Sequence, residues 1–263
     1  MDNKNINLGY DPHIDQTPVV PRYVSTIDGH GGQFIHADGD LSECARLHEE
    51  EVMTNDSYEL RKLHDRDKGI QYVVDVGANV GAFSYFIKEL WPEAHVISCE
   101  PEPKCMEWVK KNTRMFKDVT YVNKAIVGDS NLKEVTFNVC KWAGNGHVEG
   151  TFDMNFWKRY GCQVEEKITV PAVTLMKVIE DNKFPRIDLL KVDTEGSESV
   201  ILQGIKPWLK NVKYITGEYH SQVEKALITD ILKDTHNIRF TDGIHFKEDS
   251  GLSANGDIFA ELK

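Results

Sequence analysis

The feature that most constrains the fold is an alternation of short apolar runs with helical segments, which begins after Gly69. The expected strands are 72–76, 95–100, 119–123, 187–192 and 214–219. The expected helices are 80–90, 103–116, 174–182, 197–204 and 221–234. Such alternation is typical of a parallel sheet covered by helices on both faces. The last two apolar runs, "IRFTDG" and "GDIFAELK", have no helix between them, so we expect them to close the sheet as an antiparallel pair.

The sequence divides into an N-terminal extension of residues 1–69 and an α/β domain of residues 70–263. Residues 1–40 contain many turn-forming residues and predict loops with one short hairpin, whereas residues 41–69 are rich in helix formers and predict one or two helices. Within the domain, segments 133–142 and 165–173 alternate like strands. The long loop between them carries Trp142, His147, Phe156 and Trp157, which either cover a substrate or form a small loop core.

Charge and cysteine content exclude several classes of protein. The chain has 42 acidic and 31 basic residues, a net charge of -11, which opposes nonspecific binding to nucleic acid or to anionic lipid. Its 5 cysteines include no C-x-x-C pair, so neither a disulfide framework nor a zinc site is predicted. No signal peptide and no bilayer-spanning apolar run is visible. We therefore expect a soluble cytoplasmic protein with a small substrate.

The stretch "VVDVGANVGAFSYF" is an apolar strand followed by a glycine turn that opens a helix. Glycines at such a turn let a ligand approach main-chain N–H groups. Gly77 and Gly81 follow a G-x-x-x-G spacing, which lacks the middle glycine of nicotinamide-binding turns. A cofactor with an amino acid moiety fits better, and Asp75 could anchor its ammonium. The alternative is a capped turn that binds no ligand.

The second expected strand ends in "SCEPEP", which places Glu100 19 residues after Gly81. A carboxylate at this position can accept hydrogen bonds from both ribose hydroxyls of an adenosine. Pro101 and Pro103 stop the strand and start the next helix. Taken alone, Glu100 would more often be an acid at a helix start, but together with the glycine turn it indicates a nucleotide site.

The motifs "VVDVGANVG", "CEPEP", "NKAIVGD" and "LLKVDTEGSESVILQG" resemble those of FkbM-type methyltransferases, a branch of the class I enzymes that use S-adenosylmethionine. The resemblance covers residues 70–220. It implies a Rossmann-like, seven-stranded, mostly parallel sheet and methyl transfer, usually to an oxygen of a sugar, polyketide or other small metabolite. It also implies a set of cofactor contacts: Asp75, Gly77, Asn79 and Gly81 at the methionine end, Glu100 with Pro101 at the ribose, and Lys124, Ala125 and Ile126 at the adenine.

Three carboxylates follow the strand 187–192. Asp193 ends that strand and so opens onto the carboxyl edge of the sheet, where open α/β folds bind ligands. Glu195 and Glu198 are expected in the first turn of the next helix, where they favour its dipole. The alternative is that these acids bind a metal ion, but we expect no metal site here. The candidate bases for the acceptor proton are Asp193, Glu218 and His220.

Two other functions compete with an S-adenosylmethionine-dependent O-methyltransferase. One is a nicotinamide-dependent oxidoreductase, which the missing middle glycine disfavours. The other is a noncatalytic module that keeps the cofactor pocket. The acceptor, expected to be a small molecule or a glycan, and the oligomeric state do not follow from the sequence.

Overall fold

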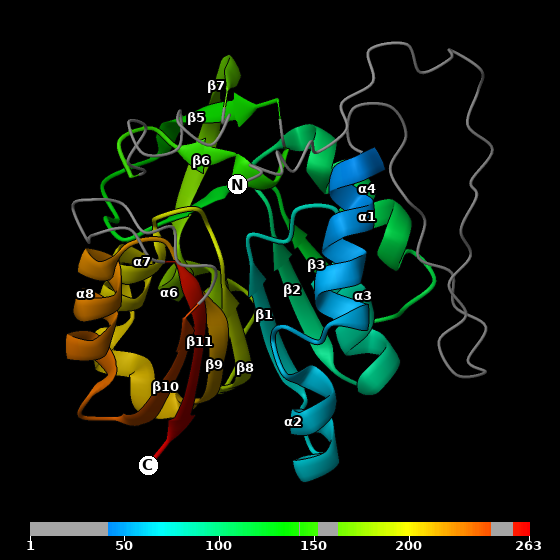
Figure 1. The fold of residues 1–263 in the computed structure, drawn as a ribbon, viewed down its shortest axis with the longest axis vertical. Helices are drawn as coiled ribbons and strands as arrows, with labels where there is room; N and C mark the ends of the chain where they lie inside the picture. The colour runs from blue at the N-terminus through cyan, green and yellow to red at the C-terminus, as the bar shows by residue number, and fades with distance from the viewer. Residues whose placement is uncertain (1–41, 142, 152–162, 243–254) are drawn as a thin grey trace, which may run out of the picture.

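The computed structural model describes residues 42–141, 143–151, 163–242 and 255–263 (Figure 1). Its centre is a seven-stranded sheet in the order β10-β11-β9-β8-β1-β2-β3. The strands are β1 (Tyr72–Val76), β2 (His95–Cys99), β3 (Val119–Val122), β8 (Ile187–Val192), β9 (Val212–Tyr219), β10 (His236–Asp242) and β11 (Gly256–Leu262). Only β11 runs against its neighbours, β9 and β10. The predicted mostly parallel sheet with an antiparallel C-terminal pair is confirmed.

Helices cover both faces of this sheet (Figure 1). One face carries α6 (Leu175–Asp181), α7 (Glu198–Gly204) and α8 (Gln222–Leu232), with the short helix η4 (Lys206–Asn211) before β9. The other carries α1 (Ser42–Glu49), the π-helix η2 (Glu50–Thr54), α2 (Leu60–Arg66), α3 (Ala82–Leu90) and α4 (Pro103–Thr113). Among the residues placed here, no helix has both the length and the apolarity that crossing a membrane requires.

The central strands are apolar on both faces because each face is packed against helices. Val73 and Leu189 belong to the cluster on the α3 side, whereas the next residues, Val74 and Leu190, belong to the cluster on the α8 side. Successive side chains of a strand point to opposite faces, so a strand buried on both sides reads as a continuous apolar run. This is the physical reason that the alternation in the sequence predicts these strands.

The helices before β1 share a core with the sheet. Ala45, Val52 and Leu60, from α1, η2 and α2, are buried in the same cluster as Phe83 and Phe86 of α3. The structure thus confirms helices between residues 41 and 69. The expected loops and hairpin of residues 1–40 lie outside the described residues.

A second, four-stranded sheet follows β3 in the chain. It has the order β4-β7-β5-β6 and consists of β4 (Ala125–Val127), β5 (Glu134–Cys140), β6 (His147–Val148) and β7 (Val164–Thr174), with the turn η3 (Ala143–Asn145). The strands predicted at 133–142 and 165–173 are therefore present, as the antiparallel pair β5 and β7. His147 is buried and lies 3.0 Å from Asn138 Nδ2. Trp142, Phe156 and Trp157 lie outside the described residues.

A buried lysine fixes the loop between α3 and β2. Lys88 is 1% exposed, and its Nζ donates to the carbonyls of Pro92 at 2.5 Å and Ala94 at 2.7 Å. We expect Lys88→Met to lower the free energy of unfolding by about 2–3 kcal/mol, because both carbonyls lose a charged donor. Urea denaturation measures the change. Lys110→Met, at an exposed position of α4, is the control and should change stability by less than about 0.5 kcal/mol. Equal losses in both variants would contradict this role of Lys88.

Candidate active site

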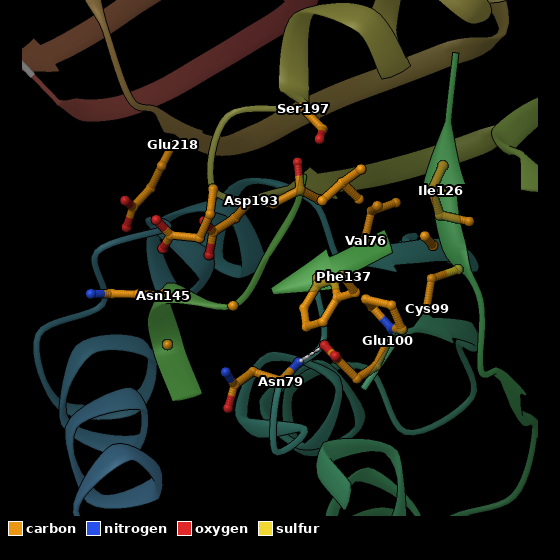
Figure 2. A pocket seen from close by; sticks show the side chains of 18 of the residues that line it. Val76, Asn79, Cys99, Glu100, Ile126, Phe137, Asn145, Asp193, Ser197 and Glu218 are labelled. Carbon is orange, nitrogen blue, oxygen red and sulfur yellow. Dashed lines mark hydrogen bonds between the residues drawn. The ribbon is translucent and has the colours of Figure 1, made fainter. Parts of the chain in front are cut away.

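A cavity opens at the carboxyl ends of the central strands (Figure 2). Val76, Cys99, Asp193 and Glu218, which end or follow β1, β2, β8 and β9, all line it. Nine of the residues predicted from the sequence lie in its wall: Gly77, Asn79, Glu100, Pro101, Lys124, Ala125, Ile126, Asp193 and Glu218. The other three, Asp75, Gly81 and His220, do not line it.

The turn after β1 requires its first glycine. Gly77 has φ +83, and a Cβ atom there would stand 1.8 Å from the carbonyl oxygen of Asp193. The N–H groups of Gly77 and Ala78 both donate to the carbonyl of Cys99, at 3.0 Å. The turn is therefore held between the ends of β8 and β2. Asn79, with φ 49, then turns the chain toward α3.

Glu100 is fixed in the cavity wall by two backbone donors. Its carboxyl accepts hydrogen bonds from the N–H groups of Asn79 and Glu102, each at 2.8 Å. Burial raises its pKa to about 8, although these two hydrogen bonds act in the opposite direction. The carboxyl is thus rigid and can exchange a proton near neutral pH. Sequence reasoning located this residue correctly at the end of the second strand.

Asp75 lies behind the turn and not in the cavity wall. Its carboxylate is fully buried, accepts a hydrogen bond from the Ser84 hydroxyl at 2.7 Å and lies 3.6 Å from Lys191 Nζ. Asp75, which was predicted to bind the ammonium group of the cofactor, therefore pairs with Lys191 of the chain itself.

Lys191 joins the turn to Asp193. Its Nζ donates to the carbonyl of Gly77 at 2.5 Å and lies 3.2 Å from Asp193 Oδ2. Sequence reasoning left this residue without a role. The signal was a lysine near the end of the run "IDLLKV", since a buried charge needs a partner.

Asp193 is held as a carboxylate at the cavity wall. The Tyr58 hydroxyl donates to its Oδ2 at 2.9 Å. Burial acts to raise the pKa of Asp193, but the charges of Lys191 and His220 outweigh burial and hold this pKa below its ordinary value. Asp193 is therefore negatively charged at neutral pH and has two partners that orient it.

The structure corrects the expected position of Glu195. Helix α7 begins only at Glu198, because Glu195 with φ 58 and Gly196 with φ +103 form a left-handed turn that cannot continue into a helix. Glu195 lines the cavity. Glu198 is fully buried and accepts hydrogen bonds from the N–H groups of Thr194 at 2.6 Å and Gly196 at 3.1 Å. Glu198 therefore stabilises this turn in addition to beginning helix α7.

His220 lies among three carboxylates behind the wall. Its ring nitrogens are 3.4 Å from Glu198, 3.5 Å from Glu195 and 3.5 Å from Glu218. Burial acts to lower its pKa, but Glu195 and Glu198 outweigh burial, so the pKa lies well above its ordinary value. His220 is therefore an imidazolium at neutral pH and has no free lone pair with which to accept a proton.

Within the part of the chain that the structure describes, two groups of side chains have the spacing of metal ligands. Asp193, Glu195 and His220 form one and Glu198, His220 and Glu224 the other, with ligand atoms within 4.8 Å of one another. Both contain the His220 imidazolium, and a metal would have to displace its proton and compete with the positive charges that the carboxylates already face. We therefore assign no metal to either group.

Several cavity residues were missed from the sequence. His48 and Glu51 come from the helices before β1, and Phe137, Asn145 and Val148 come from the second sheet. Burial is the main factor that raises the pKa of Glu51 to about 7, and its carboxyl is hydrogen-bonded to Glu218. None of these residues lies in a motif, so no local pattern could have identified them.

Comparison with known proteins identifies the family of the chain. The family model "Methyltransferase FkbM domain" matches residues 75–240. Methyltransferase sdnD of Sordaria araneosa is 27% identical over 182 residues, which cover 59% of this chain and 66% of that protein. Hexuronic acid methyltransferase AglP of Haloferax volcanii is 22% identical over 160 residues, which cover 61% of this chain and 60% of that protein. The chain thus spans less than two thirds of the length of these two relatives.

Two further matches also have names that describe methyltransferases. The 31-O-demethyl-FK506 methyltransferase FkbM of Streptomyces tacrolimicus is 26% identical over 176 residues, which cover 59% of this chain and 67% of that protein. Among solved structures, the METTL16 methyltransferase domain matches with a TM-score of 0.48 and 10% identity, over 81% of this chain and 68% of that chain. Because the family model covers more than half of the sequence, including the glycine turn, Glu100 and Asp193, the chain belongs to the FkbM methyltransferase family.

Proposed function

We propose that the protein is an S-adenosylmethionine-dependent O-methyltransferase whose acceptor is a hydroxyl group of a small molecule, sugar or glycan. The observation that carries this proposal is the arrangement of Glu100 and Asp193. They face one cavity from the ends of β2 and β8, on either side of the Gly77 turn at the end of β1. A nucleoside group and an acceptor hydroxyl would thus have separate places within one pocket.

The cavity wall fits the cofactor in its polar and apolar parts. Glu100 would accept the ribose hydroxyls, since its carboxyl is fixed and faces the cavity. Ile126 and Phe137 provide an apolar wall on the same side for the adenine (Figure 2). When bound, the cofactor supplies a methyl group activated on a sulfonium sulfur. Asp75 would act indirectly, through Lys191 and Ser84, which hold the turn from behind.

Asp193 is the group that we propose to accept the proton of the hydroxyl. Tyr58 and Lys191 keep its carboxylate charged and oriented at the wall. As the acceptor oxygen forms its bond to the methyl carbon, its proton would pass to Asp193, which contributes about 10²–10⁴-fold in such reactions. His220 is less suited because it is already protonated. Glu218 is less suited because burial and the charge of Asp193 raise its pKa well above its ordinary value, which favours the neutral carboxyl.

The relatives support an oxygen acceptor. One relative is a hexuronic acid methyltransferase, and the name of another, 31-O-demethyl-FK506 methyltransferase, places the methyl group on an oxygen. Membership in a methyltransferase family also favours this function over a nicotinamide-dependent oxidoreductase. A noncatalytic module would bind the cofactor but would not release S-adenosylhomocysteine from S-adenosylmethionine in the presence of an acceptor.

Isothermal titration with S-adenosylhomocysteine tests the cofactor site. We expect the wild type to bind it and Glu100→Gln to bind it at least about tenfold more weakly, because an amide replaces a carboxylate acceptor. Ribose hydroxyls favour the ionised form of a carboxyl whose pKa in the free protein is about 8. The affinity of the wild type should therefore rise between about pH 6 and 8, and that of the variant should not.

The matched control for this titration is Glu102→Gln. Glu102 is a buried carboxyl two residues away that does not line the cavity, so its substitution should leave the affinity unchanged. Failure of the wild type to bind, or equal affinities of the wild type and Glu100→Gln, would rule out this site for the cofactor.

Asp193→Asn tests the proposed proton acceptor. We expect the release of S-adenosylhomocysteine from S-adenosylmethionine, with a panel of glycosides and hydroxylated metabolites as acceptors, to fall by about 100-fold or more. Binding of S-adenosylhomocysteine should change by less than about threefold, because the amide keeps the shape of the carboxylate. A variant that retains more than a tenth of the wild-type rate would reject Asp193 as the base. Cofactor binding without any turnover by the wild type would instead favour the noncatalytic module.

A further inference from the structure

The end of the cavity opposite Glu100 carries several carboxyl groups. Glu51 of η2, Asp193 after β8 and Glu218 of β9 all line it, and we call these three residues the acidic wall. Figure 2 shows Asp193 and Glu218 on one side of the cavity, with Glu100 and Cys99 on the other. The acidic wall thus belongs to the same cavity as the ribose-binding candidate but lies away from it.

The order of the strands sets the distance between the two ends. β9, β8, β1 and β2 are consecutive in the sheet, and neighbouring strands lie about 4.8 Å apart. Glu218 and Glu100 are therefore separated by three strand spacings, roughly 14 Å. A cofactor with its ribose at Glu100 would extend across the turn of β1 toward Asp193. Its sulfur, which is one carbon away from the ribose ring, would then lie between Glu100 and the acidic wall.

Two positive charges near the acidic wall, those of Lys191 and His220, are already engaged. Lys191 lies behind the turn and contacts Asp75, Asp193 and the carbonyl of Gly77. His220 is buried and contacts Glu195, Glu198 and Glu218. Lys124 lines the cavity but directly precedes β4, which carries the proposed adenine contacts. Burial and the charge of Asp193 raise the pKa of Glu218 well above its ordinary value, so the negative charge of the wall comes from Asp193 and, above about pH 7, from Glu51.

We propose that Glu51 is a further specificity-determining residue, whose carboxyl in the acidic wall makes the cavity select S-adenosylmethionine over S-adenosylhomocysteine. This inference rests on the proposed function, because it assumes that the cavity binds this cofactor. The two compounds differ only at the sulfur, which is a cationic sulfonium before transfer and a neutral thioether afterwards. A negative wall near the sulfur stabilises the first and not the second. Selection of this kind also favours release of the neutral product.

Glu51 is placed by a segment that the family model does not cover. It lies on η2, between α1 and the start of β1, whereas the match begins at Asp75. The next two residues, Val52 and Met53, are buried in the core against α3, which holds the helix against the sheet. Glu51 lines the cavity together with Glu218 and Asp193, and both of these residues act on its pKa.

The test compares the affinities of S-adenosylmethionine and S-adenosylhomocysteine for the wild type and for Glu51→Gln by isothermal titration. At about pH 8 the carboxyl of Glu51 is mostly ionised, because its pKa is about 7. We expect the wild type to prefer S-adenosylmethionine, and Glu51→Gln to reduce this preference at least about threefold with unchanged binding of S-adenosylhomocysteine. Sinefungin, which carries an ammonium group in place of the methylsulfonium, should lose affinity in the same way.

Glu50→Gln is the matched control. Glu50 is the neighbouring acid of the same helix, half exposed and paired with Arg46 at 3.1 Å, so its substitution should leave the preference unchanged. An equal loss of affinity for both compounds in Glu51→Gln would show a structural role and overturn the proposal, as would an unchanged preference. If Glu51→Gln does not fold, Glu218→Gln provides the same comparison. Absence of binding of either compound to the wild type would reject the proposed function itself.

Discussion

The arrangement of the site depends on one buried ammonium group. Lys191 Nζ contacts Asp75 of β1, the carbonyl of Gly77 and Asp193 at the end of its own strand. Burial of a charge without such partners would cost free energy, but here two carboxylates and a carbonyl replace the hydrogen bonds to water. The burial of Lys191 lowers its pKa, yet Asp193 and Asp75 outweigh burial and raise it above its ordinary value. The lysine therefore stays charged, which in turn keeps Asp193 ionised at the cavity wall.

Much of the fold could be predicted from the sequence because its signals are local. The run "IDLLKV" is apolar for the same reason that it is a central strand, and β8 spans the expected residues, Ile187–Val192. The positions of Glu100 and Asp193 at strand ends follow from the same pattern. Glu195 was misplaced because its left-handed turn depends on the carboxylate of Glu198, which accepts backbone N–H groups from the residues before the helix.

The remaining site residues could not be predicted because their contacts join distant parts of the chain. Tyr58 and Asp193 are hydrogen-bonded across 135 positions of the sequence. Glu51 lies on a helix before β1 and acts on Glu218, which belongs to β9, much later in the chain. No pattern within either segment encodes such a pair. The division has a functional side as well: the motif-bearing part supplies the proposed nucleoside contacts, and the preceding helices supply part of the charged end of the cavity.

The close approach of Gly77 to Asp193 makes the two loops that carry these residues one mechanical unit. A single added carbon would overlap with the Asp193 carbonyl, and the N–H of Asp193 donates to the carbonyl of Val76 from the other direction. Neither loop can move far without the other, so the turn after β1 and the residue after β8 cannot act as separate gates. Widening of the cavity to admit or release a ligand would therefore involve other parts of its wall, such as the helices before β1 and the second sheet.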